Sequence, residues 1–413
     1  MAAAKRPRVV IDGLYGIESH GDDAMLLALV QGLRDRVPAL HVSVLSRDPL
    51  QLRRSYGLHA IRNFDHPPFV PERGPWFYGF NAGQPRKHLG AVRETIARAD
   101  LLLIGGGNLL LDITHDWLRG PIAWHAISSE LARTYRVPYA LFANSIGPFA
   151  TPWGRDRAAA IVRGAFEVGV RDRESFELAS SMRESSQAVE LLPDPALRLR
   201  PDTGAGLRAL LAVGWKPEPA PTLALSVRDL SWLHDPGADG YLRSMVELCR
   251  RTIDELGARL IFVPQCVCRI GRPEEDDRRI AQVVVSGLHR SERCFVLTES
   301  MRPETLMGVY AHANAALTTR LHGAVFAVAA GTPLLALAYL PKVRGFLRQL
   351  ELEDACVPLE AVHNIGSMLA RIERLLTDSP HTGRVVRARV EHVAARLDGQ
   401  LDRFAEVLCR NRA

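Results

Sequence analysis

Residues 315–342 read AALTTRLHGAVFAVAAGTPLLALAYLPK and carry the pattern that decides the fold. An apolar run at 315–318 precedes a polar turn, an apolar stretch of helical length, and the helix-breaking Gly331-Thr332-Pro333. A second apolar run follows at 334–338. Strand, helix and strand in this order build a parallel sheet. The pattern therefore predicts a β-α-β unit and not a membrane span, because the break leaves no run long enough to cross a bilayer.

The same alternation continues on both sides of this stretch. Predicted strands lie at 8–12, 41–46, 101–104, 139–143, 168–171 and 189–192, and again at 223–228, 260–264, 295–297, 315–318 and 334–338. Predicted helices of the first half lie at 23–36, 89–98, 121–135, 155–165 and 173–182. Regular alternation of this kind predicts parallel sheets that are covered by helices on both faces.

A break in the alternation divides the chain into two domains. Glycines after Asp202 and a Pro-rich stretch at 216–221 predict a linker over 201–222. We therefore expect an α/β fold with two Rossmann-like, doubly wound domains, 1–200 and 223–380, that face a cleft. The final segment, 381–413, is expected to be a long amphipathic helix that packs back towards the first domain.

Composition narrows the functional classes. The 413 residues suit two or three domains, and 47% hydrophobic with 24% charged residues excludes a disordered chain. The formal net charge of +6 favours anionic ligands without requiring nucleic acid, which we do not expect as a partner. Six cysteines are too few for a disulfide framework, and Cys266-Val-Cys268 lacks the spacing of a zinc site. No secretory signal is recognisable, so we expect a cytoplasmic protein, at most in peripheral contact with the inner face of a membrane.

Glycine-rich segments follow several predicted strands of the first half. Glycine permits close approach to the backbone, and a helix N-terminus offers unpaired N–H groups. Each segment is either a tight turn or a loop that binds a ligand. In the first segment, Asp22 is accordingly either a helix cap or a residue that contacts the ligand. The residues that we select for the second role are Gly13, Tyr15, Gly16, Gly21, Asp22, Gly105, Gly106, Gly107, Asn108, Asn144 and Ser145. The aromatic-rich region 64–87 is likewise either a surface loop or a mobile loop over the cleft.

Cationic side chains follow other predicted strands. Arg171 and Arg228 each stand at a strand end, and Lys342 stands at the start of a helix. The strongest local signal is Arg320-Leu321-His322, because it follows a strand and opens an apolar helix. Alone, such a histidine is more often a cap or a packing residue. Beside Arg320 and a helix N-terminus, it favours an anion site.

Together these segments resemble the polysaccharide pyruvyl transferase family over nearly the whole chain. The resemblance rests on the order and spacing of the glycine triplet at 105–107, Ile146-Gly147-Pro148, Val170-Arg171-Asp172, Asp194-Pro195, Ser226-Val227-Arg228 and Arg320-Leu321-His322. It implies a fold like that of the GT-B glycosyltransferases. It also implies transfer of the enolpyruvyl unit of phosphoenolpyruvate to two hydroxyls of a sugar, which forms a pyruvate ketal and releases phosphate during glycan biosynthesis for the cell envelope.

The reaction assigns roles to these residues. Phosphoenolpyruvate carries a carboxylate and a phosphate, so cations must bind it. We expect Arg171, Arg228, Arg320, Leu321, His322 and Lys342 to form the donor site, and the glycine-rich segments of the first half to face the acceptor. His322 is the predicted acid, supported by Arg320, and Asp22 or Asp23 is the candidate base.

The remaining expectations concern cofactors, the acceptor's carrier and alternative functions of the protein. No cofactor and no metal are expected, because arginines can neutralise the donor. The carrier of the acceptor, a lipid or a nucleotide, stays open, as does the oligomeric state. Two alternatives also stay open: a glycosyltransferase of the same architecture that uses a nucleotide sugar, and a non-catalytic binding protein on the same fold.

Overall fold

The computed structural model describes residues 6–63, 85–112, 121–184, 188–233, 240–267 and 275–410. Most of the region 64–87 and Cys268 therefore lie outside the described residues. The chain divides into two compact units. The first comprises Met1–Ile17, Met25–Pro195 and Ala395–Ala413, and the second comprises Glu18–Ala24 and Ala196–Ala394.

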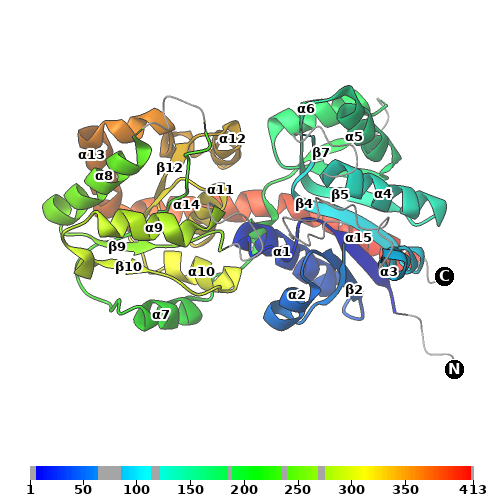
Figure 1. Cartoon of the computed structure of the whole chain (residues 1–413), viewed down its shortest axis with the longest axis horizontal. Coiled ribbons are helices and arrows are strands. Elements are labelled where there is room, and N and C mark those ends of the chain that lie inside the picture. The colour runs from blue at the N-terminus through cyan, green and yellow to red at the C-terminus, as the bar shows by residue number, and fades with distance from the viewer. Residues whose placement is uncertain are drawn as a thin grey trace. The chain divides into compact units, whose positions relative to one another are not determined.

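The first unit contains a seven-stranded parallel sheet in the order β3-β2-β1-β4-β5-β6-β7. Figure 1 labels its strands β2, β4, β5 and β7. Its strands are β1 (Arg8–Asp12), β2 (His41–Ser46), β3 (His59–Arg62), β4 (Leu101–Asp112), β5 (Tyr139–Phe149), β6 (Glu167–Val170) and β7 (Val189–Leu191). Its helices are α1 (His20–Arg36), α2 (Pro49–Tyr56), α3 (Pro85–Ala97), α4 (Pro121–Thr134), α5 (Pro152–Gly164), α6 (Arg173–Met182) and α15 (Arg396–Arg410). The first residues of α1, up to Ala24, group with the second unit.

Apolar side chains cover both faces of this sheet, as expected for parallel strands. One face packs on α3 to α6, with Val10, Leu102 and Leu141 in the shared core. On the other face, Phe404 of α15 meets Phe142 edge-on, with ring centroids 6.0 Å apart. Arg403 of the same helix pairs with Glu167 on β6.

The second unit contains a six-stranded parallel sheet in the order β10-β9-β8-β11-β12-β13. Its strands are β8 (Thr222–Ser226), β9 (Arg259–Phe262), β10 (Cys294–Val296), β11 (Ala315–Thr318), β12 (Leu334–Ala338) and β13 (Cys356–Pro358). Its helices are α7 (Thr203–Ala212), α8 (Tyr241–Leu256), α9 (Asp277–Ser286), α10 (Pro303–Tyr310), α11 (Leu321–Ala329), α12 (Pro341–Gln349), α13 (Ile365–Thr377) and α14 (Ser379–Ala394). One core joins the sheet to α8, α9 and α13, and another joins it to α7, α10, α11 and α14.

These two sheets confirm the predicted pair of doubly wound α/β units. In each sheet, the strand order reverses beside the first strand: between β1 and β4 in the first, and between β8 and β11 in the second. Ligands of such sheets bind beyond the carboxyl ends of the strands at this reversal. The fold therefore directs attention to the residues that follow β1, β4, β8 and β11.

The structure differs from the sequence expectations at several places. The range 201–222 contains α7, which packs its buried Leu210 into the core of the second unit, instead of a free linker. The glycine triplet and Asn144 lie inside β4 and β5, not in loops after them. The triplet still has a conformational role, because φ is +76° at Gly106 and +112° at Gly107.

Two further differences concern helix ends. Asp22 lies within the first turn of α1, so it is not the helix cap. The C-terminal helical segment forms as predicted but is interrupted at Ala395, which separates α14 from α15. The short strands β3 and β13, which the sequence did not indicate, occupy one edge of each sheet.

Candidate active site

Most of the residues predicted for the donor site follow strands at the strand reversal of the second unit. Ser226 at the end of β8 pairs with Thr318 at the end of β11. Arg228 and Arg320 each stand two residues beyond those strand ends, and His322 lies in the first turn of α11. Lys342 lies in the first turn of α12, after the neighbouring strand β12, and is half-buried. Leu321 is buried between Arg320 and His322.

Arg228 is held by aromatic rings. Its Nη1 donates to the hydroxyl of Tyr339 at 2.6 Å. Its guanidinium carbon lies 5.2 Å from the ring centroid of Trp232 and 5.4 Å from that of Tyr339. Within the described ranges, its Nε is buried without a hydrogen-bond partner and no carboxylate pairs with this arginine. Arg228 is therefore a cation that is positioned by stacking and whose charge is not neutralised within the described residues.

Arg320, unlike Arg228, is paired with a carboxylate. Its Nε lies 2.9 Å from both carboxylate oxygens of Asp277, and its Nη2 bonds to the same carboxylate and to the backbone oxygen of Glu275. Asp277 also accepts the backbone N–H groups of Gln265 and Cys266, each at 3.0 Å. Burial opposes the charge of Arg320, but the adjacent carboxylate outweighs it and raises the pKa of the guanidinium above its usual value. Asp277 thus fixes the orientation of Arg320.

His322 packs against the segment Glu18–Ala24, which belongs to the same unit. This segment lies along the loop after β9, where the backbone N–H of His20 donates to Gln265 at 3.0 Å. A Cβ atom at Gly21 would lie 2.0 Å from Nδ1 of His322, so only glycine fits beside the ring. Gly21 and Asp22, which we had expected on the acceptor side, therefore group with the unit that carries His322.

We expect Gly21→Ala to lower the turnover rate by about 100-fold, because the new methyl group must displace the His322 ring by more than 1 Å. The measurement is the rate of the purified variant together with its thermal unfolding midpoint. Gly345→Ala is the matched control, because a Cβ at that helical glycine meets nothing within 4 Å. Turnover close to that of the wild type in Gly21→Ala would show that the position of His322 is unimportant.

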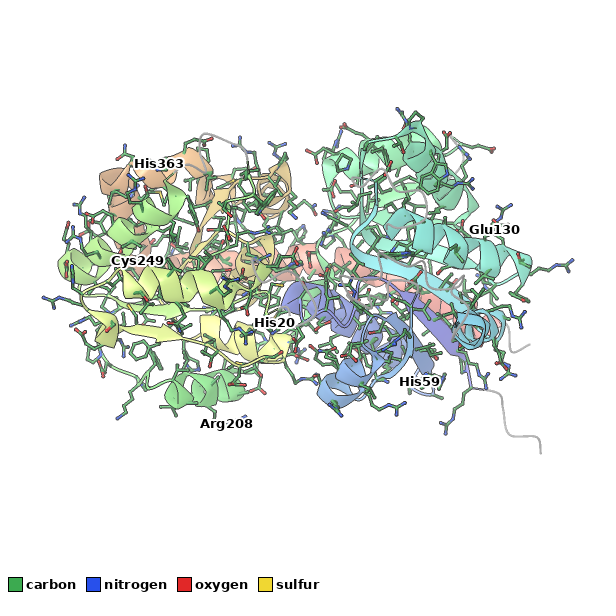
Figure 2. The ribbon with its side chains drawn as sticks, viewed as in Figure 1. His20, His59, Glu130, Arg208, Cys249 and His363 are labelled. Carbon is green, nitrogen blue, oxygen red and sulfur yellow. The ribbon has the colours of Figure 1, made fainter. Side chains whose placement is uncertain are left out.

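His20, which belongs to the same segment and is the first residue of α1 (Figure 2), is 1% exposed. Burial lowers the pKa of its imidazole to about 4, so the ring is neutral at pH 7. The unfolded chain takes up this proton at a higher pH than the folded chain. Because of this difference, the unfolding free energy is highest above pH 6.5 and decreases as the pH falls from 6.5 towards 4.

We expect the wild type to lose about 3 kcal/mol more unfolding free energy than His20→Asn between pH 7 and pH 4, since one pKa unit corresponds to about 1.4 kcal/mol. Urea unfolding of both proteins across this range measures the difference. Equal losses in the two proteins would mean that His20 titrates in the folded state as it does in the unfolded state.

Arg171 and its neighbours form a buried network in the first unit. Arg171 Nη1 pairs with Asp194 at 3.2 Å, Nε donates to Ser145 at 3.0 Å and Nη2 donates to Asn108 at 3.0 Å. Asp172 accepts the hydroxyl of Ser145 at 2.7 Å and caps α6. All three guanidinium nitrogens are bonded to protein, so donor binding by Arg171 stays a prediction.

The other residues predicted for the acceptor lie around the strand reversal of this first sheet. The hydroxyl of Tyr15 donates to the backbone oxygen of Gly105. A Cβ at Gly13 would clash with the Tyr15 ring, and one at Gly16 would clash with Ser46. Asn144 is fully buried, and its Nδ2 donates to the backbone oxygen of Ile104 at 2.7 Å.

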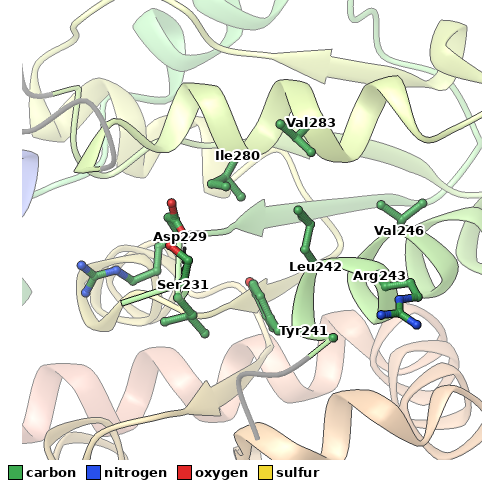
Figure 3. A pocket seen from close by; sticks show the side chains of 11 residues that line it. Asp229, Ser231, Tyr241, Leu242, Arg243, Val246, Ile280 and Val283 are labelled. Carbon is green, nitrogen blue, oxygen red and sulfur yellow. Dashed lines mark hydrogen bonds between the residues drawn. The ribbon is translucent and has the colours of Figure 1, made fainter. Parts of the chain in front are cut away.

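A pocket of about 470 Å³ adjoins Arg228 in the second unit (Figure 3). In the close-up, Ile280 and Val283 of α9 face Leu242 and Val246 of α8 across it. Its lining comprises Arg228, Asp229, Leu230, Ser231, Gly240, Tyr241, Leu242, Arg243, Val246, Ile280 and Val283. The pocket thus combines an apolar floor with a polar end at the strand terminus.

Sequence reasoning missed Asp277 and the contact between Gly21 and His322. Asp277 lies 43 positions from Arg320 along the chain, and it is one of several acidic residues near the start of α9. Within the described ranges, no group of His, Cys, Asp and Glu side chains is arranged to hold a metal ion. No helix in those ranges has the length and apolar character to cross a membrane. The five described cysteines form no disulfide.

The family model "Polysaccharide pyruvyl transferase" matches residues 20–341. The amylovoran biosynthesis protein AmsJ of Erwinia amylovora is 22% identical over 415 residues, which cover 93% of this chain and 95% of AmsJ. The matched region extends from the segment beside His322 to the first residue of α12.

Solved structures share the fold. UDP-GlcNAc 2-epimerase from Neisseria meningitidis bound to UDP-GlcNAc superposes with a TM-score of 0.59 at 11% identity, covering 98% of this chain and 100% of that chain. Anabaena Alr3699/HepE in complex with UDP-glucose also has a TM-score of 0.59, at 12% identity, with 96% and 98% coverage. These similarities confirm the predicted GT-B-like fold.

Proposed function

Because the chain belongs to the polysaccharide pyruvyl transferase family, we propose that it moves the enolpyruvyl unit of phosphoenolpyruvate onto two hydroxyls of a sugar or glycan. The product is a cyclic pyruvate ketal, and phosphate is released. Family membership makes the protein a transferase, and polysaccharide biosynthesis is its setting. We propose, beyond family membership, that phosphoenolpyruvate is the donor and that a ketal is formed.

One observation carries the choice of donor: Arg228 is a positioned cation with no carboxylate partner among the described residues. It stands at the strand reversal of the second unit, near helix starts that suit an anion. The residues that precede α11 and α12, Arg320 and Leu340, do not cap these helices with their side chains. Helix N-termini and a guanidinium are the groups that bind carboxylate and phosphate. Arg320, Lys342 and Arg171 are further candidates for donor binding.

The chemistry then proceeds in balanced steps. A proton from the His322 imidazolium adds to the methylene carbon of phosphoenolpyruvate and creates a methyl group. The adjacent carbon gains cationic character and accepts a first sugar hydroxyl oxygen. The bond between this carbon and the phosphate oxygen then breaks. The oxygen of a second hydroxyl bonds to the same carbon and closes the ketal ring. Of the two hydroxyl protons, one replaces the proton that His322 gave up, and the other leaves with phosphate.

Ligand binding and phosphate release together test this function. We expect phosphoenolpyruvate to raise the thermal unfolding midpoint, since a ligand at 100 times its dissociation constant stabilises by about 2.7 kcal/mol. We also expect phosphate release when p-nitrophenyl glycosides of glucose, galactose, mannose and N-acetylglucosamine are screened as acceptors. A shift with UDP-glucose or UDP-GlcNAc and none with phosphoenolpyruvate would favour a glycosyltransferase. No shift with any of these ligands would favour a binding protein.

Addition of a chelator is expected to leave turnover unchanged, because arginine side chains and helix N-termini neutralise the donor in this proposal. The rate of phosphate release is measured before and after treatment with EDTA, and again after addition of Mg²⁺ or Mn²⁺. Loss of turnover in EDTA that a divalent ion restores would contradict the prediction.

A further inference from the structure

Tyr339 connects two strand ends of the second unit. It directly follows β12, while Arg228 lies two residues beyond β8. These two strands lie on either side of β11. The hydrogen bond from Arg228 to the Tyr339 hydroxyl therefore crosses the carboxyl end of β11, where Arg320 precedes α11. Sheets of this kind bind their ligands at this edge, so the Tyr339 hydroxyl occupies a ligand-binding position.

The Tyr339 hydroxyl retains a hydrogen-bond donor that the protein does not use. A phenol has one O–H donor and two lone pairs. Nη1 of Arg228 donates to a lone pair at 2.6 Å, so this contact leaves the phenol's own hydrogen unengaged. Within the described ranges, no other hydrogen bond involves this hydroxyl. The O–H group is therefore available to a ligand.

The charges around this hydroxyl favour an anion as its ligand. Arg228 has no carboxylate partner within the described ranges, and Tyr339 is also close enough to Arg320 for the two side chains to interact electrostatically. A hydrogen bond received from a cation polarises the O–H group and makes it a stronger donor. An anionic oxygen that binds to Arg228 can therefore accept a hydrogen bond from Tyr339 at the same time.

Trp232 holds the tyrosine and the arginine in place. Its ring meets the Tyr339 ring edge-on, with centroids 6.3 Å apart and planes at 84°. The guanidinium of Arg228 lies over both rings. Nε1 of Trp232 donates to the backbone oxygen of Asp229 at 3.0 Å, which fixes the indole. Because the hydroxyl is positioned before a ligand binds, binding costs less conformational entropy.

We propose that Tyr339 is a further donor-binding residue, whose hydroxyl accepts a hydrogen bond from Arg228 and donates one to an anionic oxygen of phosphoenolpyruvate. This inference rests on the proposed function. The contact transfers no proton and is the same in the ground state and in the transition state. It therefore contributes to donor affinity and not to the rate of the bound complex. Phosphate and carboxylate oxygens are both suitable acceptors, and the test distinguishes them.

The test compares Tyr339→Phe with the wild type by calorimetric titration with phosphoenolpyruvate and by the phosphate-release assay. Phenylalanine keeps the ring over which Arg228 lies and removes only the hydroxyl. We expect Kd and KM to rise by about tenfold or more, because a hydrogen bond to a charged group is lost. In contrast, kcat should stay within about twofold of the wild type. Titrations with inorganic phosphate and with pyruvate show which group is contacted, since affinity should fall only for that ligand.

A second background separates direct contact from mere orientation of Arg228. Arg228→Lys keeps the charge but has no planar fork for the phenol to orient. If Tyr339 contacts the donor, Tyr339→Phe weakens binding in this background as well. No further loss there means that the tyrosine only orients Arg228, and this result overturns the proposal. Where binding is too weak for calorimetry, kcat/KM gives the same comparison. Tyr135→Phe, at a tyrosine of the first unit that is 40% exposed, is the control and should keep the wild-type affinity.

Failure of this inference is distinguishable from failure of the proposed function. If phosphoenolpyruvate neither binds to the wild type nor releases phosphate with any of the glycosides, the proposed function itself fails. If the wild type binds phosphoenolpyruvate and releases phosphate, while Tyr339→Phe with a wild-type thermal unfolding midpoint keeps the same Kd, only the assignment of Tyr339 is wrong.

Discussion

Replacement of His322 by Gln is expected to lower the rate of ketal formation by about two to four orders of magnitude, with affinity for phosphoenolpyruvate within a few fold of the wild type. Glutamine keeps a polar side chain beside Gly21, but its amide N–H groups are too weakly acidic to protonate carbon. We therefore expect the loss in the reaction step, because the proposed donor-binding groups, Arg228 and the helix N-termini, are unchanged in this variant.

The measurement follows phosphate release and the fate of solvent hydrogen. In heavy water, the wild-type product should carry deuterium in its methyl group, because carbon protonation is the step assigned to His322. His312→Gln is the control, since this histidine of the same unit bonds to the backbone oxygen of Thr203 at 2.9 Å. Near-normal turnover by a folded His322→Gln enzyme would mean that another group supplies the proton.

The largest expected effect on stability follows from Asp277→Ala. This change leaves Arg320 as a charge that is 84% buried and has lost its partner, and it removes the acceptor of two backbone N–H groups. Breaking a buried ion pair at one side costs about 3–5 kcal/mol. Because Arg320 also loses its fixed orientation, we expect weaker binding of phosphoenolpyruvate as well.

Urea unfolding and donor titration of Asp277→Ala and Asp277→Asn measure these effects. Asparagine keeps one oxygen acceptor and should cost less. The control Glu247→Ala removes an exposed carboxylate that also pairs with an arginine, Arg250, and should change stability by no more than about 1 kcal/mol. If Asp277→Ala resembled Glu247→Ala in stability and in donor binding, Asp277 would have no role in holding Arg320.

Local sequence pattern predicted most of the fold because long apolar strands and amphipathic helices carry their own signals. The strands at 8–12, 41–46, 315–318 and 334–338 have the predicted bounds. The edge strands β3 and β13 were missed because three or four residues with mixed exposure show no clear periodicity. The continuation of β4 through its glycines was missed because glycine triplets more often end strands.

The sequence predicted proximity only for candidate site residues that directly follow neighbouring strands. Arg228 and Arg320 follow adjacent strands of one sheet, so topology brings them together. Contacts that depend on three-dimensional packing gave no signal: Gly21 meets His322 across 301 positions, and Asp277 meets Arg320 across 43.

The placement of Glu18–Ala24 with the second unit has a consequence for evolution and engineering. In a protein of two units, recombination can exchange one half of the gene while the other half is kept. Here such an exchange at the chain midpoint would also replace Gly21, the residue against which His322 packs. A functional chimera must therefore carry its own seven-residue segment 18–24 with residues 196–394. The same requirement links the inheritance of the first loop to that of the Arg320-Leu321-His322 motif.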